Sequence, residues 1–202
     1  MSREAHRITR DDILSMEDFA RIRDARRAEI IAVKARRRVP VGPDITFYFE
    51  NYDTMWWQVH EMLRSEKGGE AQIDDELAAY NPLIPKGDEL VATMMIEIDN
   101  PERRARVLAG LGGIERAVAF RIDDQTIPAE PEHDVERTTS EGRTSSVHFL
   151  HFRFTAAQIE AFRSGKVPVI LEISHPRYAH MAVLPDEVRA ELAGDFDPPV
   201  AS

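Results

Sequence analysis

Hydrophobic residues between positions 88 and 174 recur with two different periodicities, which predict alternating strands and helices. Four runs are apolar and rich in β-branched or aromatic residues: 90–98, 117–122, 147–154 and 167–173. Helical stretches at 101–111 and 155–164 separate the first run from the second and the third from the fourth. This order, β-α-β-β-α-β, is that of a split βαβ unit, so we predict an α+β fold built on a ferredoxin-like sandwich.

The first 87 residues show mainly helical periodicity, which predicts an N-terminal helical layer. Helices are expected over 10–38, 54–67 and 73–80, and the Pro- and Gly-containing stretch 39–43 ends the first of them. Between the first two helices, three apolar positions alternate with three polar ones over 45–50. This alternation predicts a short strand that adds an extra edge to the sheet.

Three segments follow from these patterns, and we expect them to pack as one compact unit. Residues 1–87 form the helical layer, 88–176 the ferredoxin-like layer, and 177–202 a C-terminal cover and tail with a helix at 186–192. Packing the helical layer against the sheet covers apolar side chains such as Met95 and Phe149, which an open sheet face would leave in water.

The stretch 125–146 is polar, acidic and contains proline, and it falls where the middle hairpin of the motif would turn. A connection of about 20 residues is long for a compact domain. It is therefore either a lid or a disordered excursion, and the small number of apolar anchors favours disorder.

Composition excludes several classes of function. The chain has 202 residues, a formal net charge of -10 and no cysteine. An acidic protein lacks the positive electrostatic field that attracts nucleic acids and anionic membranes, so neither is an expected partner. Without cysteine there is no thiolate nucleophile or thiolate metal site. A redox role would need a metal held by histidine or carboxylates, a bound cofactor or a partner. The charged N-terminus and the absence of a long apolar stretch predict a cytoplasmic protein.

Strand alternation brings a group of ionisable residues onto one face of the predicted sheet. If the strands lie in the ferredoxin-like order 4-1-3-2, Glu97, His151 and Glu172 fall on adjacent strands, beside Arg121 and Arg153. Two carboxylates and an imidazole can hold a divalent metal or serve as general acid and base. The alternative is a network of Glu–Arg ion pairs beneath the N-terminal helices or in a homodimer interface, and this alternative is favoured.

Three further groups of residues have simpler explanations. On the predicted helix 54–67, Glu61 and Arg64 are three residues apart, which is the spacing of a surface ion pair. After the last predicted strand, His175 and His180 are weak candidates for haem ligands. Haem is disfavoured because no attachment motif accompanies them. Arg36, Arg37 and Arg38 form a basic patch that suits a phosphate or an acidic partner, but a solvated helix end is the favoured interpretation.

Several short motifs resemble the bacterial family DUF3501. They are Phe49-Glu50-Asn51, the run from Gln58 to Glu66, Tyr80-Asn81-Pro82-Leu83-Ile84-Pro85, and Ala92-Thr93 followed by Glu97. Genes of this family are often found beside rubrerythrin and an iron–sulfur oxidoreductase. The resemblance therefore implies a place in a peroxide-defence or electron-transfer module, with one of those two proteins as partner.

The resemblance also selects residues on the predicted helix 54–67 and the strand before it. Glu50, Gln58, Glu61, Arg64 and Glu66 match the family motifs. Helix capping and ion pairing would explain several of them without a functional role. The family often carries Gln at the position of His60, which weakens the case for His60 as a ligand.

Three functions are consistent with these observations. The favoured one is a non-catalytic accessory or binding module that contacts a redox partner, with Gln58, Arg64, Arg121 and Arg153 as candidate binding residues. The second is a metal- or cofactor-dependent enzyme that uses Glu97, His151 and Glu172, with Glu61 as an additional acid or base. The third is small-molecule sensing in the cleft between the two layers, a common location for pockets.

Overall fold

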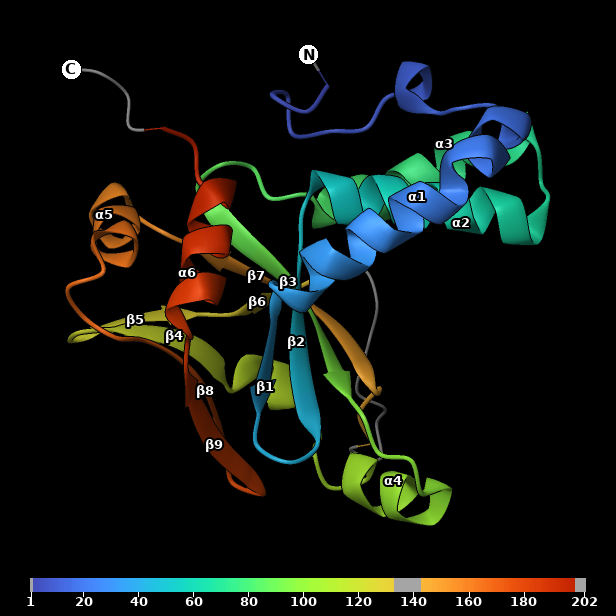
Figure 1. The fold of residues 1–202 in the computed structure, drawn as a ribbon. Helices are drawn as coiled ribbons and strands as arrows, with labels where there is room; N and C mark the ends of the chain where they lie inside the picture. Colours follow the sequence, from blue (N-terminus) through green and yellow to red (C-terminus); the bar gives the residue numbers. More distant parts are fainter. Residues whose placement is uncertain (1, 133–142, 199–202) are drawn as a thin grey trace.

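A computed structural model describes residues 2–132 and 143–198, and within them the strands form two antiparallel sheets (Figure 1). Sheet A has the strand order β1-β2-β3-β7-β6, and sheet B has the order β5-β4-β8-β9. The strands of sheet A are β1 (Arg38–Val41), β2 (Ile45–Glu50), β3 (Glu89–Ile96), β7 (Val147–Arg153) and β6 (Glu130–Pro131). Those of sheet B are β5 (Gln125–Pro128), β4 (Val118–Ile122), β8 (Val169–His175) and β9 (Tyr178–Val183).

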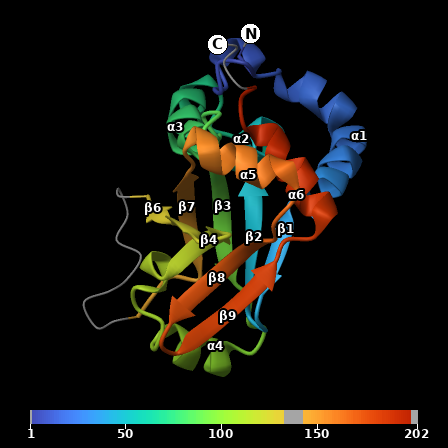
Figure 2. The same ribbon diagram turned by 90° about the vertical axis from the view of Figure 1, so that its left-hand side faces the viewer.

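The helices form a layer on one side of sheet A and cover the ends of the two-sheet sandwich. The helical layer consists of α1 (Met16–Ala35), α2 (Tyr52–Glu66) and α3 (Glu70–Tyr80). Figure 2 shows α5 (Ala156–Ser164) and α6 (Asp186–Leu192) across one end of the sandwich and α4 (Pro101–Leu108) at the other. Short 3-10 segments lie in the connections: η1 (Arg10–Asp12), η2 (Asn81–Leu83), η3 (Ile114–Arg116) and η4 (Ala193–Asp195).

Two hydrophobic cores result from this arrangement. The larger one lies between the sheets, where alternate residues such as Phe47, Phe120 and Phe152 point inward and are fully buried. The smaller one lies between the helical layer and the outer face of sheet A, and includes Phe19, Trp56 and Val91. Strand β2 contributes apolar side chains to the first core and Tyr48 and Glu50 to the opposite face, as its alternation predicts.

Local signals in the sequence explain where the central helix begins. The Asn51 side chain accepts a hydrogen bond from the Thr54 amide at 3.0 Å, and the Thr54 hydroxyl in turn accepts one from the Asn51 amide at 2.9 Å. This reciprocal cap satisfies two amides at the start of α2. Met55, Val59 and Leu63 then form the buried stripe of the helix.

The α+β class is confirmed, but the sheet does not have the ferredoxin-like order. In that order β3 would lie between β8 and β7, and β4 would flank β7. Instead β2 pairs with β3 and β6 pairs with β7, so both neighbouring positions are occupied. Strand β4 pairs with β8 in the second sheet. The hairpin of β1 and β2 thus displaces β8, and the four expected strands divide between two sheets.

Three other regions differ from the sequence prediction. The first helix ends at Ala35, and Arg37 is buried and bonded to the Phe49 and Glu50 carbonyls, so residues 36–38 form no free basic patch. The polar stretch after residue 124 contains β5 and β6, because Ile127 and Ala129 are buried. Residues 133–142 of that stretch lie outside the described residues.

The C-terminal cover also contains strand β9, which pairs with β8 before the expected helix at 186–192. Across the described part of the chain, none of the helices combines the length and apolar character needed to cross a bilayer.

Candidate functional site

The structure separates the three residues that were expected to form a metal or acid–base site. His151 on β7 is opposite Val91 of β3, whereas Glu97 follows the far end of β3. Glu172 lies on β8 in sheet B, opposite Ala119 and Met181. The expected proximity depended on the 4-1-3-2 order, which the structure does not have. No group of three potential metal-ligating residues occurs within 2–132 and 143–198.

Each of these charged residues instead has a local partner. Nδ1 of His151 lies 3.1 Å from Oε2 of the buried Glu89, and Arg121 donates to Glu172 at 3.4 Å. Arg153 donates to Glu130 of the neighbouring strand β6 at 3.0 Å. Arg121 and Arg153 thus form Glu–Arg pairs that are local to each sheet, and His151 contacts a glutamate of the neighbouring strand β3.

The two histidines near the end of sheet B contact different partners. His175 closes β8, where its Nε2 lies 3.3 Å from the Gly112 carbonyl and its Nδ1 accepts from the Arg177 amide at 3.2 Å. His180 is exposed on β9 and stacks edge-on against Tyr178, with ring centroids 4.5 Å apart. Both side chains have the contacts of turn and sheet-edge residues.

Glu61 on α2 is held by arginines. Arg23 of α1 donates two hydrogen bonds to its carboxylate at 2.7 and 2.8 Å, and Arg64 donates a longer one at 3.3 Å. The hydrogen bonds and charge of Arg23, followed by the charge of Arg64, lower the pKa of Glu61. A carboxylate with a lowered pKa is a poor general acid or base near neutral pH, so this residue fastens α1 to α2.

His60 is fully buried, on the face of α2 that points away from solvent. Nδ1 lies 2.8 Å from the Trp56 carbonyl and Nε2 accepts a hydrogen bond from the Leu14 amide at 3.0 Å. These two partners require a neutral ring with its proton on Nδ1. Burial lowers the pKa of His60, which is consistent with that neutral form. The residue anchors the segment before α1 and is not available as a ligand.

A cavity of about 320 Å³ lies between the helical layer and the outer face of sheet A. We call it the interlayer cavity. It is lined by Lys34 of α1, Tyr48 and Glu50 of β2, Met55 and Gln58 of α2, Tyr80 of α3, Leu83 of η2, Thr93 and Met95 of β3, and Val147 and Phe149 of β7. Its volume lies at the lower end of the range of small-molecule pockets.

Glu50 is the central polar group of this cavity. Its residue is only 7% exposed, and each carboxylate oxygen accepts a hydrogen bond of 2.7 Å from a threonine hydroxyl. Thr93 on β3 donates to Oε1, and Thr54 on α2 donates to Oε2. Because each carboxylate oxygen offers about two lone pairs, both oxygens retain capacity to accept a further hydrogen bond.

Other polar residues of the lining are also oriented by partners. Gln58 hydrogen-bonds with Tyr80, and burial raises the pKa of Tyr80. The Tyr48 hydroxyl donates to Glu97 at 2.9 Å, and burial followed by this carboxylate raises the pKa of Tyr48. Both phenols are therefore neutral near pH 7. Glu97, one of the residues selected from the sequence, thus contacts the cavity lining rather than a metal site.

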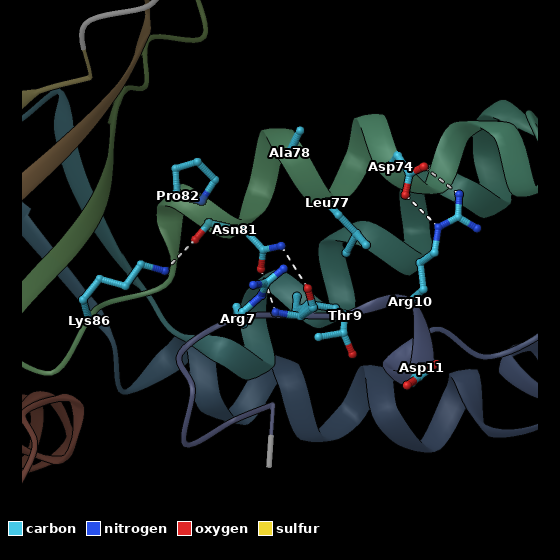
Figure 3. Close-up of a pocket in the computed structure, with 11 residues that line it drawn as sticks. Arg7, Thr9, Arg10, Asp11, Asp74, Leu77, Ala78, Asn81, Pro82 and Lys86 are labelled. Carbon is cyan, nitrogen blue, oxygen red and sulfur yellow. Dashed lines mark hydrogen bonds and ion pairs between the residues drawn. The ribbon is translucent and has the colours of Figure 1, made fainter.

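A groove of about 780 Å³ lies between α3 and residues 7–11, which belong to the segment 6–14, here called the N-terminal strap (Figure 3). The Asn81 amide accepts from the Ile8 N–H at 2.6 Å and donates to the Ile8 carbonyl at 2.9 Å. Lys86 donates to the carbonyls of His6 and Asn81, and Arg10 forms a two-bond ion pair with Asp74. These groups fasten the strap, so the interlayer cavity is the better ligand site.

Sequence reasoning located only part of this site. Gln58 was selected as a binding residue and Glu50 as a family-matched residue, and both line the cavity. Thr93, Tyr80 and Lys34 were not selected as site residues. The signal for Thr93 was a polar residue in the interior of an apolar run, which indicates either an exposed face or a buried polar partner.

Comparison with known proteins finds a matching family and a similar solved structure. Residues 7–196 match the family described as "Protein of unknown function (DUF3501)". A crystal structure of a novel protein of unknown function from Burkholderia pseudomallei K96243 is 40% identical in sequence, with a TM-score of 0.87. The match covers 94% of this chain and 99% of that one. No curated protein matches the sequence significantly.

Proposed function

The chain belongs to the DUF3501 family, and from that premise we propose that it is a non-catalytic binding module that takes a small polar ligand into the interlayer cavity. The observation that carries this proposal is the buried Glu50 carboxylate, held at a cavity wall by Thr54 and Thr93. Hydroxyl donors satisfy part of its hydrogen-bonding capacity but bring no positive charge to it. A ligand that donates a hydrogen bond would complete its coordination.

The rest of the lining limits the class of ligand. Glu50 favours a donor such as an ammonium, an amide N–H or a hydroxyl, because bonds to a charged acceptor are the stronger ones. Lys34 supplies a cation from the opposite layer, suited to an acceptor group on the same ligand. Phe149 and Met95 provide an apolar wall. A small zwitterion or amide with a short apolar body fits these three requirements.

Binding without catalysis is supported by what surrounds Glu50. The adjacent polar groups, Tyr48, Tyr80 and Gln58, are held by partners and the two phenols have raised pKa values. The geometry therefore supports recognition of a ligand.

The family resemblance gives the setting of this proposal. We expect the module to serve a rubrerythrin-linked redox or peroxide-defence system, with rubrerythrin or the iron–sulfur oxidoreductase as its protein partner. Purified rubrerythrin from the same organism can be titrated against the chain by calorimetry. Saturable binding supports this setting, and the absence of binding to either candidate partner contradicts it.

Ligand binding is tested by a saturation-transfer NMR screen of small amines, amides, amino acids and alcohols. Hits are ranked by affinity for the wild type, Glu50→Gln and Glu172→Gln. Loss of a charge-assisted hydrogen bond is expected to weaken a true cavity ligand at least about tenfold in Glu50→Gln. Glu172→Gln makes the same chemical change on sheet B and should leave the affinity unchanged. Equal affinities for all three proteins would contradict the proposal.

A further inference from the structure

A second cavity, of about 700 Å³, lies where the end of α2 meets the start of α3 and the segment before α1. We call it the helix-end cavity. It is lined by Arg10, Ile13, Leu14, Ser15, Met16, Leu63, Arg64, Lys67, Gly69, Glu70 and Ile73. It shares no lining residue with the interlayer cavity.

The lining of this cavity is apolar at its base. Leu63 is 4% exposed, and Ile13, Leu14 and Ile73 pack against the same hydrophobic cluster beneath the helical layer. Met16 stands at the edge and is 38% exposed. Ile13, Leu14 and Ile73 are half-buried and so keep some contact with water, and an apolar ligand that covers them and Met16 gains hydrophobic free energy.

Cationic side chains border the same cavity. Arg10, Arg64 and Lys67 line it together with a single acidic residue, Glu70, although the whole chain carries a net charge of -10. Arg10 is neutralised by two hydrogen bonds to Asp74. Positive charge at this border is therefore carried mainly by Arg64 and Lys67.

These two cations are weakly engaged within the protein. Arg64 reaches Glu61 with one bond of 3.3 Å, while Arg23 already makes two shorter bonds to that carboxylate. Lys67 is exposed and forms no ion pair with any residue the structure describes. Both are free to contact an anionic group placed at the border of the cavity.

We infer that the helix-end cavity binds a medium-chain carboxylate, with its hydrocarbon chain over Leu63 and Ile73 and its carboxylate between Arg64 and Lys67. An apolar base with cations on one side is complementary to a molecule that has an apolar body and one anionic end. The guanidinium of Arg64 suits a carboxylate because its N–H groups can donate in parallel to both oxygens. This site is independent of the interlayer cavity and of Glu50.

The test is isothermal titration calorimetry with hexanoate, octanoate, decanoate and decanol below their micelle concentrations. Burial of the chain predicts an affinity that rises about fourfold with each added methylene. The cations predict that decanoate binds more tightly than decanol. Affinity that does not depend on chain length, or equal affinities of decanoate and decanol, would overturn the inference.

The double variant Arg64→Gln/Lys67→Gln removes both cations from an exposed surface, so the fold is expected to persist, as thermal unfolding can verify. It should bind decanoate about tenfold more weakly and decanol unchanged. Arg106→Gln/Lys166→Gln removes one arginine and one lysine elsewhere and should match the wild type. An equal loss in both double variants would show a general charge effect and overturn the inference. Glu50→Gln should leave decanoate binding intact, which separates this test from that of the proposed function.

Discussion

The hydroxyl of Thr93 donates a hydrogen bond of 2.7 Å to the carboxylate of Glu50, beneath the helical layer. The two residues lie on neighbouring strands of sheet A, and Thr54 of α2 binds the second carboxylate oxygen. This buried carboxylate therefore links the sheet to the helical layer and also borders the interlayer cavity. Its hydrogen bonds should contribute to stability as well as to ligand recognition.

Replacing Thr93 by Val removes the hydroxyl donor but retains a β-branched side chain of similar size. We expect the free energy of unfolding to fall by about 1–3 kcal/mol, because one oxygen of a buried carboxylate loses its partner. Urea denaturation measures this change. Thr126→Val, on the exposed face of edge strand β5, is the matched control and should change stability by less than about 0.5 kcal/mol. Equal effects of the two substitutions would show that the Glu50 bond contributes little.

Stability should decrease in mild acid because of His60. Burial places its folded-state pKa below the ordinary value of 6.5, so the unfolded chain takes up a proton first as the pH falls. Stability is therefore complete above about pH 6.5 and declines below it, by at most about 1.4 kcal/mol per pH unit for one proton. Unfolding free energies between pH 7.5 and 5 measure this decline.

His60→Gln cannot titrate and should show a shallower decline over the same pH range. The exposed His180→Gln is the control and should keep the slope of the wild type. A slope that is unchanged in His60→Gln would assign the acid sensitivity to other groups.

Arg37 should be among the most sensitive positions in the chain. Its side chain is buried, donates to the carbonyls of Phe49 and Glu50, and forms an ion pair with the buried Asp195. Arg37→Met leaves that carboxylate without its cation, and we expect a loss of about 3–5 kcal/mol in the free energy of unfolding.

The combination of Arg37→Met with Asp195→Asn should lose less than the sum of the two single changes, because the second removes the unpaired charge. Denaturation of the four proteins in a double-mutant cycle measures this coupling. Additive losses would mean that the two side chains do not interact. Arg36→Met, at an exposed neighbour, provides the control for the loss of an arginine.

Any side chain at Gly42, in the turn between β1 and β2, should destabilise the fold. This residue has a φ of +73°, and a Cβ atom would lie 2.6 Å from the Tyr178 hydroxyl. That hydroxyl donates to the Val41 carbonyl and accepts from the Asp44 amide, so it joins the two sheets. Gly113 has a similar φ of +80° but no atom within 4 Å of its would-be Cβ.

Gly113→Ala should therefore lower the free energy of unfolding only by the backbone penalty, about 1–2 kcal/mol. Gly42→Ala should lower it distinctly more. Thermal unfolding of the two variants compares them directly. Equal costs would show that the Tyr178 contact adjusts without penalty.

Elements with strong local signals were predictable from the sequence. The strand at 45–50 and the helix at 186–192 have the expected bounds, and α2 differs from its expected range by two residues at its start and one at its end. Alternation and helix capping determine such elements within a few residues of chain. The pairing of strands depends on contacts between distant segments, and the sequence pattern did not show that β2 would occupy the edge of β3.

Proline explains two elements that were missed. Pro40 was interpreted as part of a helix-breaking stretch, but it lies in β1, an edge strand, where a missing N–H costs little. Pro131 lies in the edge strand β6 for the same reason. The candidate site was expected in the wrong place because sheet faces were assigned from that incorrect strand order. The cleft between the layers, the third alternative, is where the cavity lies.

The most direct test of the central claim is amide chemical-shift mapping with the tightest ligand from the screen. We expect shift changes concentrated around Gln58, Tyr80 and Thr93, on three elements that border the cavity beside Glu50, and their loss in Glu50→Gln. Changes confined to sheet B, or a pattern that is identical in Glu50→Gln, would contradict that claim.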